Sequence, residues 1–236
     1  NGWQGQVISS SNSRCLVETF QGLRISVALV NLKLFEPLSP EQGGFHIAWP
    51  PEGAVDALAD FSARSAAVLA RDGYCVVQLS VSQEVTSGAV EEALYGRQKW
   101  KRMRQELEAA YLGRHVQSKT AWLQEMVEEK EELETPVDTL DLYLARFTQI
   151  MLPVAPFALD FMPHSRTSGM LRVPLSEDVP AEKLSEEDIF RGLVDDHVDF
   201  LKRRRLCMLL TVDGSGAELT LIPKDSAHGI VFTLSS

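Results

Sequence analysis

The spacing of hydrophobic positions changes along this chain, from a helical period in its middle to a strand-like pattern near its C-terminus. Residues 55–72 carry apolar side chains at helical spacing and stop before Gly73, which predicts a helix ended by a glycine. The apolar run 74–79 then predicts a short strand. Upstream, residues 15–20 and 23–35 predict two strands joined by a glycine-containing turn, and the polar residues 1–14 are expected to be loose.

Residues 85–152 predict mainly helix, with apolar stripes that we attribute to core packing. Trp100 and Tyr111 fall on one face of a first helix, and Trp122 begins a second. Pro136 is expected to break the helical run, and Asp138 to cap the next helix. Further on, Ser185-Glu-Glu-Asp188 is typical of a capping box that opens a short helix over 186–194. The C-terminal third contains four strand-like runs, at residues 169–173, 206–212, 218–222 and 229–234.

Helices followed by closely spaced strands indicate an α+β fold whose sheet region is a sandwich or barrel. The connector at residues 37–53 is rich in proline and glycine and predicts a boundary. We therefore expect an N-terminal extension at residues 1–53, with a possible strand pair, and a main domain at residues 54–236.

Composition and charge limit the kinds of binding partner and the cellular compartment that we expect for this chain. The formal net charge is −10 and the pI is near 5.0, which argues against a nucleic-acid-binding protein. No apolar run has the length of a membrane span. The 3 cysteines are odd in number and show no Cys-x-x-Cys spacing, so we expect a reducing intracellular compartment, either cytosol or an organelle after removal of a targeting segment. A chain that starts at Asn1 is expected to be a processed or excised piece.

The main candidate for chemistry is the tripeptide His197-Val-Asp199, just before the run 206–212. On an extended backbone, residues two apart point to the same face, so the imidazole and the carboxylate would reach one ion together. They would supply two ligands of the 2-His-1-carboxylate set that holds non-haem Fe(II). His228 is the fallback third ligand, and the alternative interpretation of the tripeptide is a surface ion pair.

The order of motifs around this tripeptide resembles a known family. His197-Val-Asp199 is followed by a basic stretch, an apolar run, a glycine-containing turn and Ala217-Glu-Leu-Thr-Leu-Ile-Pro223. This order is similar to that of the Fe(II)/2-oxoglutarate-dependent dioxygenases of the prolyl-hydroxylase type. Arg71-Asp-Gly-Tyr74 is similar to the family's N-terminal helix-to-strand segment. The resemblance covers residues 55–236 and is closest over 195–234.

The resemblance implies a double-stranded β-helix (jelly roll) behind an N-terminal helical layer. It also implies that His197 and Asp199 are Fe(II) ligands and that 2-oxoglutarate is the cosubstrate. The chain departs from the family in having Gly216-Ala217 in place of Gly-Gly. The family's distal histidine and its 2-oxoglutarate-binding arginine would fall beyond Ser236, so the domain is expected to be incomplete at its C-terminus.

The sequence is compatible with two functions. It does not decide whether the chain is an enzyme. The first is a hydroxylase domain acting on a peptidyl residue or a small molecule. The alternative is a non-catalytic jelly-roll-like interaction or assembly subunit of a larger complex. Its docking surfaces would be residues 1–53 and the acidic stretch 125–134.

Overall fold

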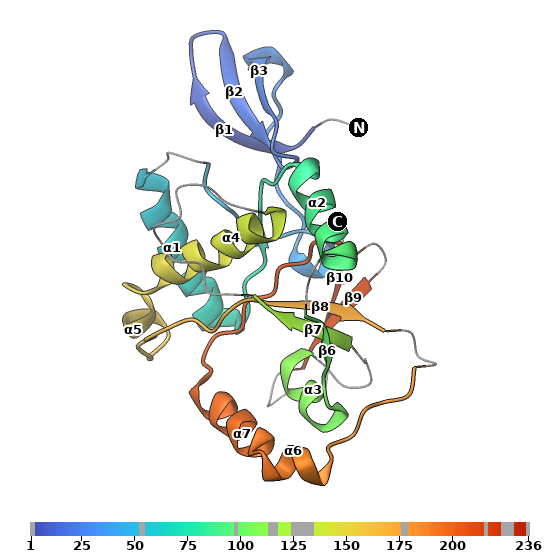
Figure 1. The fold of residues 1–236 in the computed structure, drawn as a ribbon. Coiled ribbons are helices and arrows are strands. Elements are labelled where there is room, and N and C mark those ends of the chain that lie inside the picture. Colours follow the sequence, from blue (N-terminus) through green and yellow to red (C-terminus); the bar gives the residue numbers. More distant parts are fainter. Residues whose placement is uncertain are drawn as a thin grey trace. The chain divides into compact units, whose positions relative to one another are not determined.

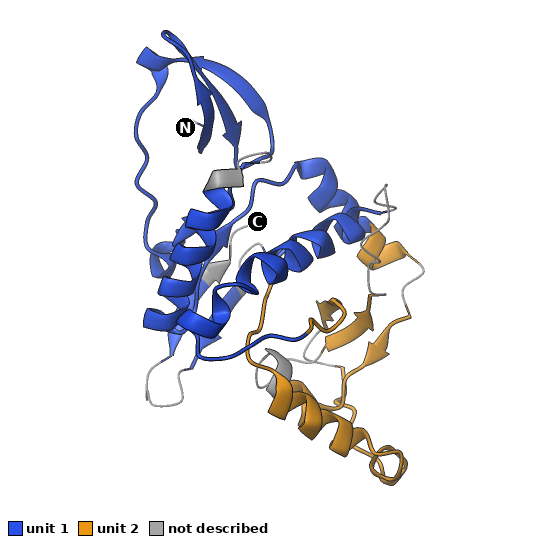
Figure 2. Ribbon diagram, turned by 90° about the vertical axis from the view of Figure 1, so that its left-hand side faces the viewer, with its two compact units in different colours: residues 1–91, 133–164, 210–236 blue, residues 92–132, 165–209 orange. Residues whose placement is uncertain are grey.

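The computed structural model describes residues 3–51, 55–96, 99–112, 118–123, 135–175, 179–214, 217–222 and 229–234 (Figure 1). The chain divides into two compact units that alternate along the sequence (Figure 2). Unit 1 comprises residues 1–91, 133–164 and 210–236, and unit 2 comprises residues 92–132 and 165–209.

An antiparallel sheet of three strands begins unit 1, in the order β1 (Gly5–Ser10), β2 (Arg14–Thr19) and β3 (Arg24–Ala28). The predicted strand pair is confirmed as β2 and β3, joined at Gly22, whose φ of 76° favours glycine. Two expectations were wrong. Residues 5–10, within the stretch expected to be loose, form β1 and pair with β2, and the strand predicted to reach residue 35 ends at Ala28. A 3₁₀ turn, η1 (Leu29–Asn31), follows it.

The helix predicted over residues 55–72 is confirmed as α1 (Val55–Asp72). It ends at Gly73, where a φ of 77° reverses the chain into β5 (Val77–Gln78), the core of the predicted strand. β5 pairs in parallel with β4 (Ile47–Ala48), which precedes the helix. The connector before α1 is thus hydrogen-bonded to the strand after it.

An aromatic cluster packs these elements together. Trp49 lies edge-to-face against Phe61 of α1, with ring centroids 5.1 Å apart, and against Tyr143 of α4 (Pro136–Met151) at 5.7 Å. Phe147, one turn further along α4, completes the cluster at 6.1 Å from Phe61. Edge-to-face pairs are the favoured aromatic geometry and add to the burial of apolar area. β4, α1 and α4 therefore share one core.

The start of α4 differs from the prediction. Thr135 is the N-cap, and its hydroxyl accepts a hydrogen bond from the Asp138 backbone N–H at 3.1 Å. Pro136 occupies the first helical turn, where a missing N–H costs nothing. Pro136 therefore starts α4, and residues 124–134, where the preceding helical run was expected to end, lie outside the described residues.

The remaining elements complete the description of unit 1. Helix α2 (Gln83–Tyr95) begins in unit 1 and ends in unit 2, α5 (Ala155–Ala158) follows α4, and η2 (Pro40–Gln42) lies within the connector. The last two predicted strands are confirmed as an antiparallel pair, β9 (Ala217–Leu221) and β10 (Ile230–Leu234).

Unit 2 contains a second antiparallel sheet and three short helices. The strands β6 (Lys101–Arg102), β7 (Ser118–Trp122) and β8 (Met170–Pro174) pair in that order. The helices are α3 (Gln105–Leu112), α6 (Glu186–Phe190) and α7 (Leu193–Arg203). β8 confirms the predicted run 169–173, and the capping box at Ser185 and Asp188 is present at the start of α6.

Other expectations for unit 2 and its boundary were wrong. Trp100 precedes a strand, and the helix predicted from it starts only at Gln105. Trp122 lies in β7 rather than in a helix. Residues 206–212 were predicted to form a strand but have no strand pairing. The acidic stretch 125–134 lies outside the described residues.

The fold is mixed α and β, as the sequence predicts. Within the described ranges the strands form four small sheets of two or three strands, and none closes into a barrel, so the jelly roll is not confirmed. The predicted boundary between residues 53 and 54 stays a prediction. None of the helices in the described part of the chain is long and apolar enough to cross a membrane.

Candidate functional site

The tripeptide His197-Val-Asp199 lies in the middle of helix α7. Gly192, in the left-handed region with φ 79°, separates α7 from α6. The acidic Asp195 and Asp196 occupy the first turn, and basic residues occupy the last. Both placements favour a helix, because its dipole attracts negative charge at the N-terminus and positive charge at the C-terminus.

His197 faces the interior of unit 2. It is 9% exposed and lies on the inner stripe of α7 with Val194 and Leu201, at helical spacing. Helix α7 contacts α3 within the same unit. Burial lowers the pKa of His197, and the nearby Arg204 lowers it further. The imidazole is therefore neutral at pH 7, as a metal ligand must be, but it is held within a helical packing face.

Asp199 faces away from that stripe. Its side chain is 65% exposed, and its carboxylate lies 3.3 Å from the ammonium group of Lys202 one turn later. The Arg203 guanidinium donates a hydrogen bond to the Asp199 backbone carbonyl at 3.1 Å. Asp199 is thus a surface residue in an i, i+3 ion pair with Lys202.

The expectation that His197 and Asp199 share one face was wrong. Successive residues of an α-helix are rotated by 100°, so positions i and i+2 point about 200° apart. The two side chains as placed do not fit a single Fe(II) ion. In the part of the chain that the structure describes, no group of three or more histidine, cysteine, aspartate or glutamate side chains could hold a metal. The fallback ligand His228 lies outside the described residues.

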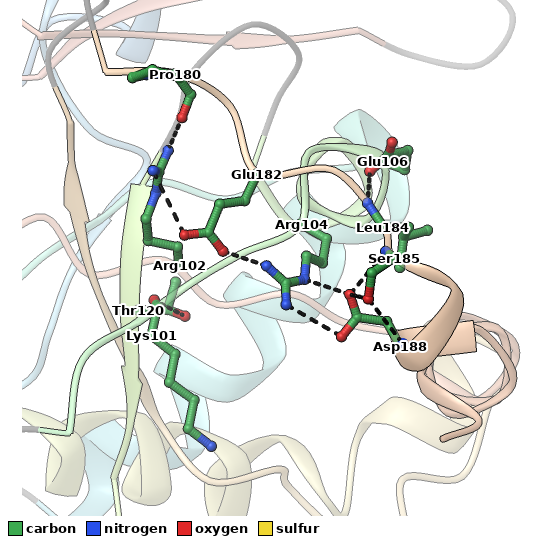
Figure 3. Close-up of polar contacts among 10 residues, drawn as sticks. All are labelled: Lys101, Arg102, Arg104, Glu106, Thr120, Pro180, Glu182, Leu184, Ser185 and Asp188. Atoms are coloured by element: carbon green, nitrogen blue, oxygen red, sulfur yellow. Dashed lines mark hydrogen bonds and ion pairs between the residues drawn. The ribbon is translucent and has the colours of Figure 1, made fainter. Parts of the chain in front are cut away.

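A dense polar network in unit 2 centres on Arg104 (Figure 3). Its guanidinium binds both carboxylate oxygens of Asp188, at 2.9 and 3.2 Å, and also pairs with Glu182. Beside it, Glu106 accepts a hydrogen bond from the Leu184 backbone N–H at 3.0 Å. The hydrogen bonds to the backbone and hydroxyl of Ser185, followed by those from Arg104, lower the pKa of Asp188 to about 2. The network fastens residues 180–188 to α3 and the end of β6.

A buried ion pair supports the sheet of unit 2. Glu108 of α3 is buried, and its carboxylate lies 3.1 Å from the guanidinium of Arg172 on β8. The hydroxyl of Ser118 on β7 donates to the same carboxylate at 2.5 Å and accepts from Arg172 at 3.1 Å. Each of these charges is paired, which is what burial of a charge requires. This arrangement stabilises the fold and offers no reactive group.

A second polar cluster lies in unit 1 around His46. Its Nδ1 accepts a hydrogen bond from the Val76 backbone N–H at 2.9 Å, and its Nε2 lies 3.8 Å from an oxygen of Asp72. The Tyr74 ring lies 5.2 Å from the imidazole, and the Tyr74 hydroxyl donates to Glu41. Burial, followed by the hydrogen bond to Glu41, raises the pKa of Tyr74 to about 12. Tyr74 is therefore a neutral hydrogen-bond donor at pH 7.

Sequence reasoning singled out Arg71 to Tyr74 but missed His46. The residues that contact His46 lie about 30 positions later, across the whole of α1, as in its hydrogen bond with Val76. The available signal for His46 was its position next to the apolar Ile47 and Ala48, in the connector that precedes α1. The cluster holds one imidazole, two carboxylates and a phenol, which is enough for proton exchange.

The opposite orientations of His197 and Asp199 predict unequal mutational effects. His197→Ala removes a buried ring and is expected to destabilise unit 2 by about 1–3 kcal/mol. Asp199→Ala removes an exposed ion pair and is expected to change stability by less than about 0.5 kcal/mol. Urea unfolding of both variants measures the difference. Equal losses in the two variants would contradict the helical placement.

The Arg104 network predicts local rather than global destabilisation. Arg104→Gln is expected to speed hydrogen exchange of the Leu184 amide by about threefold to tenfold, because the segment loses its charged contacts. Arg191→Gln breaks an exposed pair with Glu187 and serves as the matched control. Because the pKa of Asp188 is lowered, the protection should be constant above its ordinary value of 3.8 and fall as the pH drops toward 2. Equal exchange in the two variants would rule out this role.

Comparison with known proteins assigns no family to this chain. No protein-family model, no curated protein and no solved structure matches it.

Proposed function

We propose that this chain is a non-catalytic assembly domain that associates with a second copy of itself. The observation that supports this is a concentration of exposed apolar side chains directly after β3. Within residues 29–38, which we name the apolar segment, Val30 is 91% exposed and Leu34 is 86% exposed. The segment's other exposed large apolar residues are Leu29, Phe35 and Leu38.

Five such side chains in ten residues differ from the usual protein surface. Single exposed apolar residues are common and need no explanation, whereas contiguous ones mark interaction sites. Covering a valine or leucine side chain contributes about 1.5–3 kcal/mol each, so two or three of them can offset part of the entropy lost on association. The apolar segment is also continuous along the chain, which lets one partner surface cover it.

The absence of net charge on the apolar segment permits a second copy as the partner. The whole chain has a formal net charge of −10, so most approaches of two copies are opposed by repulsion. The apolar segment contains only Lys33 and Glu36 as charged residues and is therefore neutral. Two copies can bring these segments together while their acidic surfaces stay apart.

The test is sedimentation equilibrium over a range of concentrations and salt. We expect a monomer–dimer equilibrium that tightens as salt screens the repulsion between acidic chains. The double variant Val30→Asp/Leu34→Asp should weaken dimerisation by at least about tenfold, since two carboxylates would be desolvated. The control is Phe157→Asp/Phe190→Asp, which changes equally exposed residues outside the segment (91% and 92%).

Two outcomes would contradict the assembly function. One is a chain that stays monomeric at the highest concentration reached. The other is an equal loss of dimer in the double variant and in the control, which would locate the contact elsewhere.

The second candidate is the Fe(II)/2-oxoglutarate-dependent hydroxylase that the motif order resembles. Two observations favour it: α1 passes through Gly73 into β5, and β9 contains the Glu-Leu-Thr-Leu run, as the resemblance expects. A jelly roll would require these strands to belong to larger sheets. His197 and Asp199 as placed do not fit the iron, and we derive no catalytic step from them.

Metal analysis of the full-length protein distinguishes the two candidates. A hydroxylase whose ligands are His197 and Asp199 should lose Fe(II) and 2-oxoglutarate turnover in both His197→Ala and Asp199→Ala. The control His164→Ala changes an exposed histidine of unit 1 and should retain both properties. For the assembly function we expect the iron content to be the same in all of these proteins.

A further inference from the structure

The side chain of His46 adds one hydrogen bond to the backbone hydrogen bonds that join β4 and β5. The two strands pair over only two residue positions, Ile47 with Val77 and Ala48 with Gln78. His46 extends this joint, because its backbone N–H donates to the Val76 carbonyl at 3.0 Å while its imidazole accepts from the Val76 N–H at 2.9 Å. Val76 is thus bound through both of its backbone groups to one residue.

This geometry requires a neutral imidazole. A ring nitrogen that accepts a hydrogen bond carries no proton, so Nδ1 is deprotonated and the proton of neutral His46 is on Nε2. Protonation would place an N–H on Nδ1, facing the N–H of Val76, and two donors cannot bond to each other. The hydrogen bond would be lost rather than weakened.

The charged groups around His46 do not prevent this loss. In the described residues these groups are Asp72 and Arg71 at the end of α1, Glu41 of η2, and the titratable Tyr74. Asp72 lies 3.8 Å from Nε2 but is bound by Arg71 through two contacts of 2.5 and 2.7 Å. Glu41 accepts the hydrogen bond of Tyr74. Both carboxylates therefore already have partners that reduce their attraction for an imidazolium.

Burial supports the neutral state as well. The His46 side chain is 13% exposed, and burial is the main cause that lowers its pKa, with Arg71 acting in the same direction. Asp72 and Glu41 act in the opposite direction but do not reverse it. Since the folded pKa lies below the ordinary 6.5, the contribution of His46 to stability is complete above pH 6.5 and falls as the pH drops.

We propose that His46 is an acid-sensitive latch, whose protonation releases the Val76 amide and loosens the β4–β5 joint. Residues 39–49, the part of the connector that follows the apolar segment, would then be held to the strand after α1 by backbone hydrogen bonds alone. The aromatic contacts of Trp49 with α1 and α4 do not titrate and would keep unit 1 folded. The latch is therefore a local opening within a folded unit, of the kind that hydrogen exchange detects.

The test is the pH dependence of Val76 amide protection in the whole chain, corrected for intrinsic exchange. In the unmodified protein, protection should fall by about tenfold or more between about pH 7.5 and 5, as the protonated fraction of His46 rises. His46→Asn supplies an amide oxygen in place of Nδ1 that does not titrate. Its protection should change by less than about twofold over the same range.

His164→Asn, at an exposed histidine of the same unit, should keep the pH profile of the unmodified protein. A pH-independent amide in the unmodified protein, or the same fall in His46→Asn, would overturn the proposal. Nitrogen chemical shifts of the His46 ring provide a measurement that needs no variant. Deprotonated Nδ1 with protonated Nε2 near pH 7.5 supports the latch, and the opposite tautomer refutes it.

Discussion

The packing of Trp49 against α1 and α4 is the contact on which unit 1 depends. It joins a residue of the connector to two helices that lie far apart in the sequence, through rings 5.1 and 5.7 Å away. Gln6 of β1 adds a hydrogen bond to the Trp49 carbonyl at 2.6 Å, which ties the N-terminal sheet to the same point. Because Trp49 fixes the end of β4, the chain just before it is held against β5. The position of His46 follows from this constraint.

Helix geometry decides what the His-x-Asp motif can do in unit 2. On a strand the same two residues would supply two of the three protein ligands of a metal site, but on α7 they are a buried imidazole and a solvated carboxylate on different faces. The difference lies in the period of the backbone, 3.6 residues rather than 2, and not in the chemistry of the side chains. A short motif therefore carries functional information only once the period of its backbone is known. The dioxygenase resemblance stays a prediction that the placement of these two residues does not support.

The sequence predicted those elements whose signal is local. Helix α1 was found with its limits because a helical stripe ends at Gly73, and β8, β9 and β10 were found because each is a short apolar run. β1 was missed because Gly5–Ser10 is a polar strand held by pairing rather than by burial. α7 was missed because the His-x-Asp match outweighed the helical spacing of Val194, His197 and Leu201, which is visible in the sequence. His46 could not be found in this way, because its hydrogen-bond partner is brought to it only by the turn after α1.

The two proposals for unit 1 concern adjacent parts of the chain, and this adjacency links them. The apolar segment ends at Leu38 and runs directly into the connector that His46 attaches to β5. A latch that loosens the connector would weaken one of the restraints on the segment, while β3 and the packing of Trp49 remain. Self-association of a less restrained segment costs more conformational entropy, because binding must then order the connector as well as the apolar segment. Acid would also reduce the net negative charge that opposes dimerisation, so the two effects oppose each other. The pH dependence of assembly therefore separates the two effects. Loss of negative charge alone strengthens the dimer smoothly as the pH falls. The latch adds a loss of dimer affinity in the pH range where His46 titrates and Asp72 does not.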